Sequence, residues 1–382
     1  MGLANKLKDL AVELERKNNS LFEYPVDKQK KYVGHFMEPK DDIERSYFQY
    51  RCQMKFNRPF VTFLLNLASL PMIGLYLRKS NNEIKERKEG NTIFFSDGKP
   101  SNIIPDELRA NVGNIEVIDE KREYLSKWDK SFIKSLWKRY PFSWQFLLKC
   151  LMKIRFYRYE IERLHPSTII VCNEYSFTSS VLTKYCEDLG IRHINVMHGE
   201  KLYFMRDSFF RFFECFVWDN HYVSMFERLR AEKSQFKVTV PASLRIQKTA
   251  KAKTVDFTYY LGAEKGDILR TIVKAMVDLK NKNCRVAIRP HPRYSDIEEI
   301  KANVTNVEIE DTKFITIEDS LGRTSHAISV YSTVLNQASF NDVRVVLDDV
   351  SDPVKYSRLQ DIDYIMFSKP HELLSELLER RR

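Results

Sequence analysis

The sequence predicts an α/β protein made of two domains, each with parallel strands that alternate with helices. Three observations support this prediction. The chain has 382 residues, which is enough for two domains of ordinary size. Short apolar, β-branched runs alternate with helical patterns along most of it. A polar and basic segment at residues 241–254, which lacks apolar periodicity, separates two regions of this alternation.

The first region starts with helices. Apolar residues recur at helical spacing over residues 3–17 and 43–63. The runs predicted as strands are residues 91–96, 115–118, 168–173, 192–197 and 212–218. Residues 127–163 and 179–189 are predicted helices, the second ended by Gly190. The run at residues 168–173 is apolar and β-branched, which is typical of a buried strand in a parallel sheet.

The second region repeats the alternation. Its predicted strands are residues 255–261, 285–289, 326–330 and 343–347, and its predicted helices are residues 267–280, 295–302 and 333–340. We therefore expect two Rossmann-like domains, residues 1–240 and 255–382, joined by a linker at residues 241–254. Ligands of such sheets bind beyond the carboxyl ends of the strands. We expect the domains to face each other across a central cleft that holds the site.

One segment is apolar over nearly the length of a spanning helix. Residues 60–77 contain few polar groups, but Asn66, Ser69, Pro71 and Gly74 interrupt the run. These residues favour a buried, kinked helix over a membrane span. At the other end of the chain, residues 372–382 form an amphipathic, basic segment. It is interpreted either as a packing helix with solubilising arginines or as a contact with an anionic membrane.

The cysteines and the first residues indicate a compartment. None of the six cysteines forms a C-x-x-C pair, and all lie in apolar segments, so we expect reduced thiols in a cytoplasmic protein. Residues 1–17 are charged and helical in pattern, unlike a signal peptide.

The charge balance points to an anionic partner. The chain has 62 Lys and Arg against 52 Asp and Glu, a net charge of +10. Basic and aromatic residues interleave over residues 127–158 and suit an acidic polysaccharide, although a solvated helix face is an equal alternative. The candidate acceptor contacts are Lys130, Lys134, Arg139, Lys153 and Arg155. No nucleic-acid-binding signature is present, so no nucleic acid partner is expected.

Two predicted strand ends in the second region carry candidate chemistry. The first is Arg289-Pro290-His291-Pro292, where two prolines stiffen the chain around one imidazole. The second runs from Ser329 to Thr333 and includes Ser332, with small hydroxyl residues at a predicted helix start. Such groups bind phosphate, although a simple turn and a simple helix cap are alternatives. Both motifs at one sheet edge would stabilise a departing phosphate.

A His-Pro pair followed by Ser-x-x-Ser-Thr resembles the bacterial sialyltransferases of GT-B architecture, and the length and charge resemble capsular polysialyltransferases in particular. This resemblance implies a GT-B-like fold in which residues 1–240 bind the acceptor and residues 255–382 bind CMP-sialic acid. It implies that His291, Pro292, Ser329, Ser332 and Thr333 contact the CMP group. It also implies inverting transfer to a growing polysialic acid capsule chain.

The family's general base is acidic and lies in the N-terminal half, where this sequence departs from the family motif. Glu174, at the end of a predicted buried strand, is the preferred candidate, and Asp97 before Gly98 is the alternative. His198, before Gly199, is similar to a residue of transferases that use CDP-glycerol or Kdo donors. No Cys/His cluster has zinc spacing, and no D-x-D motif suggests a metal-dependent sugar transferase, so we expect no metal and no cofactor.

Alternative functions remain open. One is a capsular or teichoic-type transferase that uses another CMP- or CDP-activated donor, such as Kdo or glycerol phosphate. Another is a non-catalytic protein that binds polyanions. If the preferred prediction is right, the enzyme is cytoplasmic. It would associate peripherally with the inner face of the membrane or with a capsule-synthesis complex.

Overall fold

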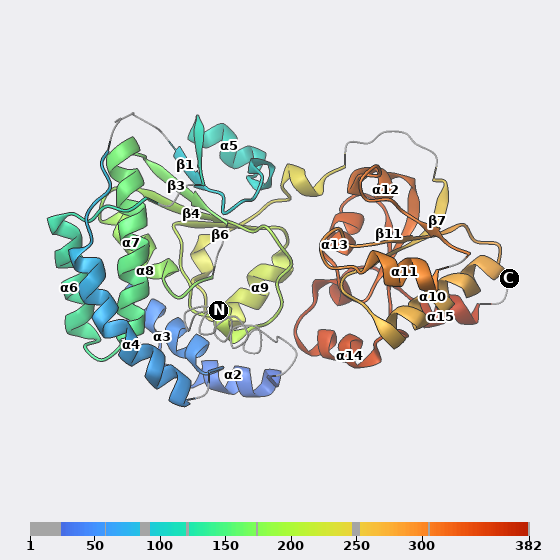
Figure 1. Cartoon of the computed structure of the whole chain (residues 1–382), viewed down its shortest axis with the longest axis horizontal. Coiled ribbons are helices and arrows are strands. Elements are labelled where there is room, and N and C mark those ends of the chain that lie inside the picture. The colour runs from blue at the N-terminus through green and yellow to red at the C-terminus, as the bar shows by residue number, and fades with distance from the viewer. Residues whose placement is uncertain are drawn as a thin grey trace. The chain divides into compact units, whose positions relative to one another are not determined.

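The structure is a computed structural model that describes residues 24–57, 59–84, 92–119, 122–172, 175–246, 253–304 and 306–380 (Figure 1). These residues form two compact units. The first runs up to His198 and resumes over Tyr203–Thr239, and the second combines Gly199–Leu202 with the chain from Val240 onwards. The helix predicted over residues 3–17 lies outside the described residues.

The first unit is built on a six-stranded parallel sheet with the order β2-β1-β3-β4-β5-β6. Its strands are β1 (Thr92–Phe95), β2 (Ile115–Ile118), β3 (Thr168–Val171), β4 (Arg192–Val196), β5 (Glu214–Val217) and β6 (Phe236–Val238). Every residue of β1 and β3 is buried, as expected for the centre of a parallel sheet. The two strands pair in register, with Thr92 opposite Thr168.

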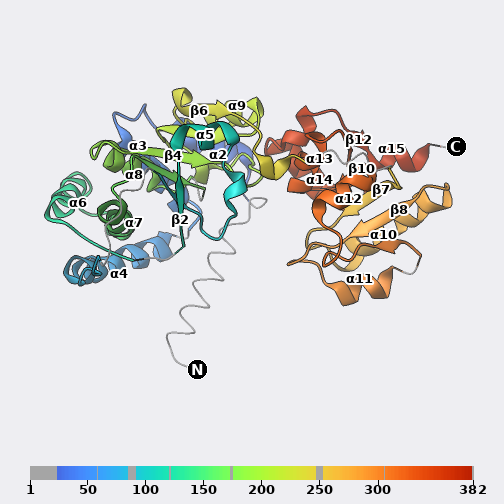
Figure 2. The same cartoon turned by 90° about the horizontal axis from the view of Figure 1, so that it is seen from above.

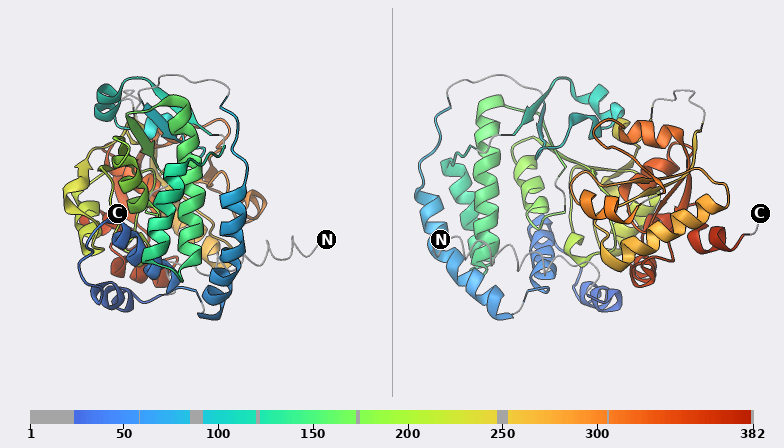
Figure 3. Two further views of the ribbon diagram at one scale, coloured as in Figure 1. Left: turned by 90° about the vertical axis from the view of Figure 1, so that its left-hand side faces the viewer. Right: turned by 45° about the vertical axis from the view of Figure 1, so that its right-hand side comes forward.

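The helices of the first unit are α2 (Val26–Gly34), α3 (Asp42–Met54), α4 (Pro59–Arg78), α5 (Asp106–Val112), α6 (Lys127–Arg139), α7 (Trp144–Leu164), α8 (Ser179–Glu187) and α9 (Asn220–Arg228). Helices α8 and α9 pack against β4 and β5. Helices α4 and α6 both pack against α7, so that these three form a neighbouring group (Figures 2 and 3).

The second unit is built on a six-stranded parallel sheet with the order β12-β11-β10-β7-β8-β9. Its strands are β7 (Val255–Tyr260), β8 (Val286–Arg289), β9 (Glu308–Ile309), β10 (Thr324–Ser329), β11 (Arg344–Leu347) and β12 (Glu372–Leu373). Counted along the chain within this unit, the strand order is the 3-2-1-4-5-6 order of Rossmann folds. The predicted α/β class is therefore confirmed in both units.

The helices of the second unit are α10 (Gly266–Asn281), α11 (Ile297–Asn303), α12 (Ile317–Arg323), α13 (Thr333–Ser339), α14 (Pro353–Asp361) and α15 (Leu374–Glu379). The buried face of α10 shares one apolar core with β7 and β8. Leu374 and Leu377 of α15 are buried in the same core, so the end of the chain is a packing helix as far as Glu379. The predicted helix over residues 372–382 was too long, because β12 forms first.

Most other predicted elements are confirmed with small shifts. The region at residues 127–163 divides into α6 and α7 at a turn that includes Pro141. Helix α6 begins at a capping box, in which Ser126 and Asp129 bind each other's backbone N–H groups. The edge strands β6, β9 and β12 were missed because each has only two or three residues. All six cysteines are free thiols, and only Cys284 is not fully buried.

The prediction of a buried helix over residues 60–77 was wrong. Helix α4 exists and contains Pro71, but most of its large apolar side chains are exposed. Its protein-facing residues include Ser69, which is 5% exposed, and Ile73, which is 1% exposed. Apolar composition therefore indicated the helix but not the side on which its apolar residues lie.

Part of the predicted linker is ordered against the second unit. Residues Ala242–Leu244 form a short 3-10 turn, and Leu244 is buried. The Asn341 side chain accepts a hydrogen bond from the Ile246 N–H at 2.7 Å and donates one to the Leu244 carbonyl at 2.7 Å. These contacts attach residues 241–246 to the end of α13.

Candidate functional site

Each sheet has one place where adjacent strands lead their connections in opposite directions. In the second unit this switch point lies between β7 and β10, and in the first between β1 and β3. The loops that leave the carboxyl ends of such strands separate and leave a crevice, which is where ligands bind in open α/β sheets. The residues that follow β7, β8 and β10, and those that follow β1 and β3, are therefore the candidate site positions.

His291 is held in a fixed orientation after β8. Its backbone N–H donates to Ser295 Oγ at 2.8 Å, and that hydroxyl donates to the Gly262 carbonyl at 2.9 Å, which ties the loop after β8 to the loop after β7. Its Nδ1 accepts hydrogen bonds from the N–H groups of Arg293 (3.1 Å) and Tyr294 (3.3 Å). The neutral ring therefore carries its proton on Nε2.

The surroundings of His291 favour this neutral form. Partial burial lowers the pKa of His291, the Arg293 charge lowers it further, and the Glu264 carboxylate opposes both. The Tyr294 ring stacks on the imidazole with a centroid separation of 4.4 Å. His291 can therefore donate a hydrogen bond through Nε2–H while its ring is neutral, without a second proton on Nδ1.

The hydroxyl motif after β10 has an inner and an outer part. Ser329 is fully buried, and its Oγ donates to the Tyr260 carbonyl of β7 at 2.9 Å. Ser332 caps α13, because its Oγ accepts the Val334 N–H at 3.2 Å. Ser332 and Thr333 are only half-buried, whereas Ser329 links two strands. The predicted donor contacts of Ser332 and Thr333 therefore concern accessible side chains, and that of Ser329 does not.

A carboxylate that was not predicted lies beside this motif. Glu200 belongs to Gly199–Leu202, which groups with the second unit, and it accepts a hydrogen bond from the Asn336 side chain of α13. Burial raises the pKa of Tyr331, and the Glu200 charge adds to this effect. The same two causes raise the pKa of Tyr364, whose hydroxyl donates to the Ser332 carbonyl at 3.3 Å. The only hint in the sequence was the position of Glu200 directly after a predicted strand-end turn.

Asp348, at the end of β11, has a structural role. It is fully buried and accepts hydrogen bonds from the Tyr259 hydroxyl at 2.6 Å and from the N–H groups of Val350 and Ser351, each at 2.9 Å. These hydrogen bonds satisfy the buried carboxylate and account for its position.

In the first unit the ends of three strands are connected. His198, after β4, donates from Nδ1–H to the Cys172 carbonyl at 2.5 Å, and Cys172 Sγ lies 3.2 Å from the Ser96 carbonyl. Asp97 lies in the left-handed region with a φ of 49°, in a turn with Gly98, and is exposed. Glu174, the preferred base, lies outside the described residues.

The prediction that Arg155 contacts the acceptor was wrong, because its side chain is fully buried. Its guanidinium donates to the carboxylate of Glu123 at 3.1 Å and to the carbonyls of Tyr76 (3.1 Å) and Ser80 (3.2 Å). Arg139 pairs with Asp41 at 2.5 Å. The position of Arg155 on a basic, aromatic helix did not reveal that it points inward.

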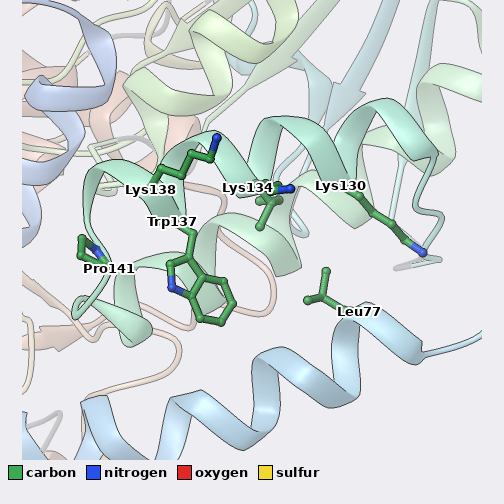
Figure 4. A pocket seen from close by; sticks show the side chains of 7 residues that line it. Leu77, Lys130, Lys134, Trp137, Lys138 and Pro141 are labelled. Carbon is green, nitrogen blue, oxygen red and sulfur yellow. The ribbon is translucent and has the colours of Figure 1, made fainter.

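Lys130 and Lys134 line a groove of about 520 Å³ between α4 and α6, shown in Figure 4. Leu77 and Trp137 form its apolar walls, and Lys138 completes the row of cations. Lys153, on α7, is half-buried. In the part of the chain that the structure describes, no three His, Cys, Asp or Glu side chains gather as metal ligands.

Comparisons with solved structures find similar arrangements at low identity. The wall teichoic acid polymerase TagF, soaked with CDPG, is 10% identical over 84% of this chain and 89% of its own, with a TM-score of 0.41. The glycotransferase of kitacinnamycin is 11% identical over 77% and 91%, with a TM-score of 0.44. A UDP-N-acetylglucosamine 2-epimerase from Listeria monocytogenes is 11% identical over 71% and 82%, with a TM-score of 0.41. No family model and no curated protein matches the chain.

Proposed function

We propose that the chain is an inverting glycosyltransferase of GT-B type that moves sialic acid from CMP-sialic acid to the growing end of a polysialic acid chain. One observation carries this proposal most directly. The His-Pro and Ser-x-x-Ser-Thr motifs follow β8 and β10, the two strands that flank β7 at the switch point of a Rossmann-order sheet. Phosphate groups of nucleotides bind at such positions.

The transfer requires three events at the reacting carbon. The acceptor hydroxyl oxygen attacks the anomeric carbon of the donor, while the bond from that carbon to the phosphate oxygen of CMP breaks. CMP leaves with the bonding electron pair, and the hydroxyl proton passes to a base. The products are CMP and a chain one sugar longer, and attack opposite to the leaving group inverts the anomeric configuration.

The second unit would stabilise the leaving phosphate. His291 donates from Nε2–H without being protonated, and the hydroxyls of Ser332 and Thr333 supply neutral donors. Donors that are already in place when charge develops are effective, each contributing on the order of 3 kcal/mol in the transition state. This set of donors can act where another enzyme uses a divalent ion, so no metal or cofactor is included in the proposal.

The first unit would supply the base and the acceptor site. Glu174 is the proposed base and Asp97 the alternative, and both follow strands of the β1–β3 switch point. The acceptor is an anionic polysaccharide, for which Lys130, Lys134, Arg139 and Lys153 stay the proposed contacts. Paired charges are screened within about 8 Å at physiological ionic strength, so acceptor affinity should fall as salt rises. The enzyme would act at the cytoplasmic side of the membrane.

Two measurements test the proposal. Equilibrium binding of CMP tests the nucleotide site and separates an enzyme from a protein that binds only polyanions. Incubation with CMP-sialic acid and a short sialyl oligomer should lengthen the oligomer and release CMP in equal amounts. Binding of CMP without transfer would reject sialic acid as the donor sugar, and the absence of CMP binding would reject the whole assignment.

A second candidate is a transferase that uses another CMP- or CDP-activated donor, such as Kdo or glycerol phosphate. The observation that favours it is the orientation of His198. Because Nδ1–H donates to the Cys172 carbonyl, the neutral ring has its lone pair on Nε2, as a general base requires. Release of CMP from CDP-glycerol or CMP-Kdo, measured beside CMP-sialic acid, distinguishes this candidate.

A further inference from the structure

Helix α4 presents apolar side chains to its surroundings. The exposed fractions are 69% for Phe60, 61% for Phe63, 45% for Leu64, 47% for Leu67 and 62% for Leu75. Proteins rarely expose a continuous apolar surface of this kind unless another surface covers it. Helix α4 is also long and apolar enough to cross a bilayer, by length and composition alone.

The inner side of α4 is attached to the first unit by polar contacts. The Asn66 side chain donates to the Phe142 carbonyl at 2.8 Å and accepts the Gln145 N–H at 3.0 Å. Ser69 and Ile73 are buried against the unit, and Arg155 binds carbonyls at the end of the helix. The helix is therefore held along its side, with an outward apolar strip about 30 Å long at 1.5 Å per residue.

Cations lie beside this strip. Lys130, Lys134 and Lys138 are spread along α6, which borders the groove that contains Leu77 and Trp137 (Figure 4). Among the described residues none of these three lysines forms an ion pair with a carboxylate. At the amino end, a second groove of about 590 Å³ is lined by Arg51 and Lys55 together with Phe63 and Phe142.

We propose that α4 is a membrane-docking helix that lies in the plane of a bilayer containing anionic phospholipids. The exposed Phe and Leu side chains enter the acyl region, and the cations that border the strip meet the lipid phosphates. A helix that combines one apolar side with flanking Lys and Arg binds membranes in this way. Trp137 lies between the apolar side chains of α4 and the lysines of α6, and indole rings are favoured at the boundary between the acyl region and the lipid head groups.

The distribution of charge disfavours a second copy of the chain as the occupant. In an isologous contact the same surface serves both copies. Two such surfaces, each bordered by cations, would then bring cations of one copy close to cations of the other, and like charges across an interface are unfavourable. An anionic lipid surface has the complementary charge. Lys130 and Lys134 are also proposed acceptor contacts, so an anionic acceptor would compete with anionic lipid for them; the docking proposal does not depend on the proposed enzymatic activity.

Flotation of the full chain with lipid vesicles tests the proposal. Vesicles of phosphatidylcholine with about one third phosphatidylglycerol should carry the protein, whereas pure phosphatidylcholine should carry much less, since anionic lipid attracts each nearby cation. Raising the salt concentration should weaken binding to the anionic vesicles.

Two variants, each compared with a control variant in exposed residues elsewhere, locate the surface. Combined Phe60→Gln, Phe63→Gln and Leu75→Gln should lower vesicle affinity at least about tenfold, because these large apolar side chains would no longer leave water. The control is Phe314→Gln with Val354→Gln, which changes side chains 84% and 71% exposed in the second unit. Combined Lys130→Gln, Lys134→Gln and Lys138→Gln should reduce the dependence on anionic lipid, with Lys237→Gln, Lys274→Gln and Lys313→Gln as the control of equal charge.

Thermal unfolding of each variant, compared with that of the unmodified chain, checks that it is folded. The proposal is overturned if the unmodified chain does not float with anionic vesicles, or if the control variants lose as much affinity as the α4 variant. It is also overturned if sedimentation equilibrium shows a dimer that the α4 variant alone abolishes, because the strip would then belong to a second copy.

Discussion

His193 is an imidazole enclosed in the core of the first unit. Its Nε2 lies 3.0 Å from the Tyr157 hydroxyl, and its Nδ1 lies 2.8 Å from Thr183 Oγ1. Burial, aided by the charge of Lys153, lowers the pKa of His193 to about 3. The folded protein therefore holds this ring neutral over a pH range in which the unfolded chain protonates it.

We predict that His193 contributes to acid sensitivity. Between its unfolded pKa of about 6.5 and its folded pKa of about 3, the unfolded state binds one more proton, so stability falls as pH falls. From pH 7 to pH 5 this loss amounts to about 2 kcal/mol. His193→Gln, which can still bond Tyr157 and Thr183, should lose that much less over the same interval. Urea unfolding at both pH values measures the difference, and equal losses in the two proteins would contradict the prediction.

His291 provides a prediction about the donor site. His291→Ala should lower turnover by roughly two to four orders of magnitude, the usual range for such donors and acids. Because the neutral ring already donates through Nε2–H, the activity of the unmodified protein should show no loss attributable to this residue between pH 7 and 8. Initial rates across that range measure both effects. Near-normal turnover in the variant would end the assignment of His291.

Three variants test which residue is the general base. Glu174→Gln should abolish transfer and preserve CMP binding, whereas Asp97→Asn should keep at least about a tenth of the activity, a limit of about 1.4 kcal/mol on its role. His198→Asn separates the second candidate function, in which this ring is the base. Single-turnover rates with saturating donor provide the measurement. If Asp97→Asn is the inactive variant instead, the base moves to the end of β1.

At this scale the sequence predicted positions better than orientations. His291 and Ser332 are at the carboxyl edge, as predicted from the runs before them. Ser329 belongs to the same motif, but it is the last residue of β10 and its side chain points to β7. The contact between Glu200 and Asn336 joins distant parts of the chain, and no local pattern contains such information.

Among the elements, α4 depends on a neighbouring helix for its end. The carbonyl of Tyr76 is among those that a helix leaves without internal partners, and the carbonyl of Ser80 lies just beyond the helix end. Arg155 of α7 donates to both while it also pairs with Glu123. The same strand–helix patterns that located α4 and α7 did not show this contact, because a buried arginine has the same spacing as a solvated one.

We predict that Arg155→Leu lowers the free energy of unfolding by about 3 kcal/mol, as for other buried ion pairs that lose one partner. Glu123 keeps its contact with Lys79 at 2.8 Å, so the loss should be at the lower end of that range. Arg139→Leu, which removes a partly exposed pair with Asp41, should cost no more than about 1 kcal/mol. Urea unfolding of both variants tests the contrast, and equal effects would show that the buried contacts are unimportant.

For the whole molecule, the sequence predicted the parallel architecture because strand and helix periods alternate clearly on both sides of residues 241–254. The sequence did not reveal the short edge strands. It also led to a wrong prediction for α4, because a helix that is apolar on every side does not show which side faces the protein. The predicted central cleft and the roles of the two domains stay predictions.

The molecule as a whole is predicted to need no metal. Under the proposed function, His291 and the hydroxyls of Ser332 and Thr333 can stabilise the leaving phosphate without a divalent ion. Transfer from CMP-sialic acid should therefore proceed at the same rate in excess EDTA. Loss of activity in EDTA that Mg²⁺ or Mn²⁺ restores would show a metal requirement. An unrelated metal-dependent transferase, assayed in parallel, confirms that the chelator is in excess.

The pairing of β7 with β10 and of β1 with β3 also affects how the protein is made. During translation, Val255 can pair with Thr324 only after Thr324 has been synthesised, and Thr92 with Thr168 only after Thr168 has been synthesised. At synthesis rates of roughly 5–20 residues per second, each wait lasts on the order of 10 s. The nascent chain therefore carries unfinished sheet edges during translation, and long-range pairings of this kind fold slowly. The junction where ligands are expected to bind in each sheet therefore forms only after the strands on one side of it have been synthesised.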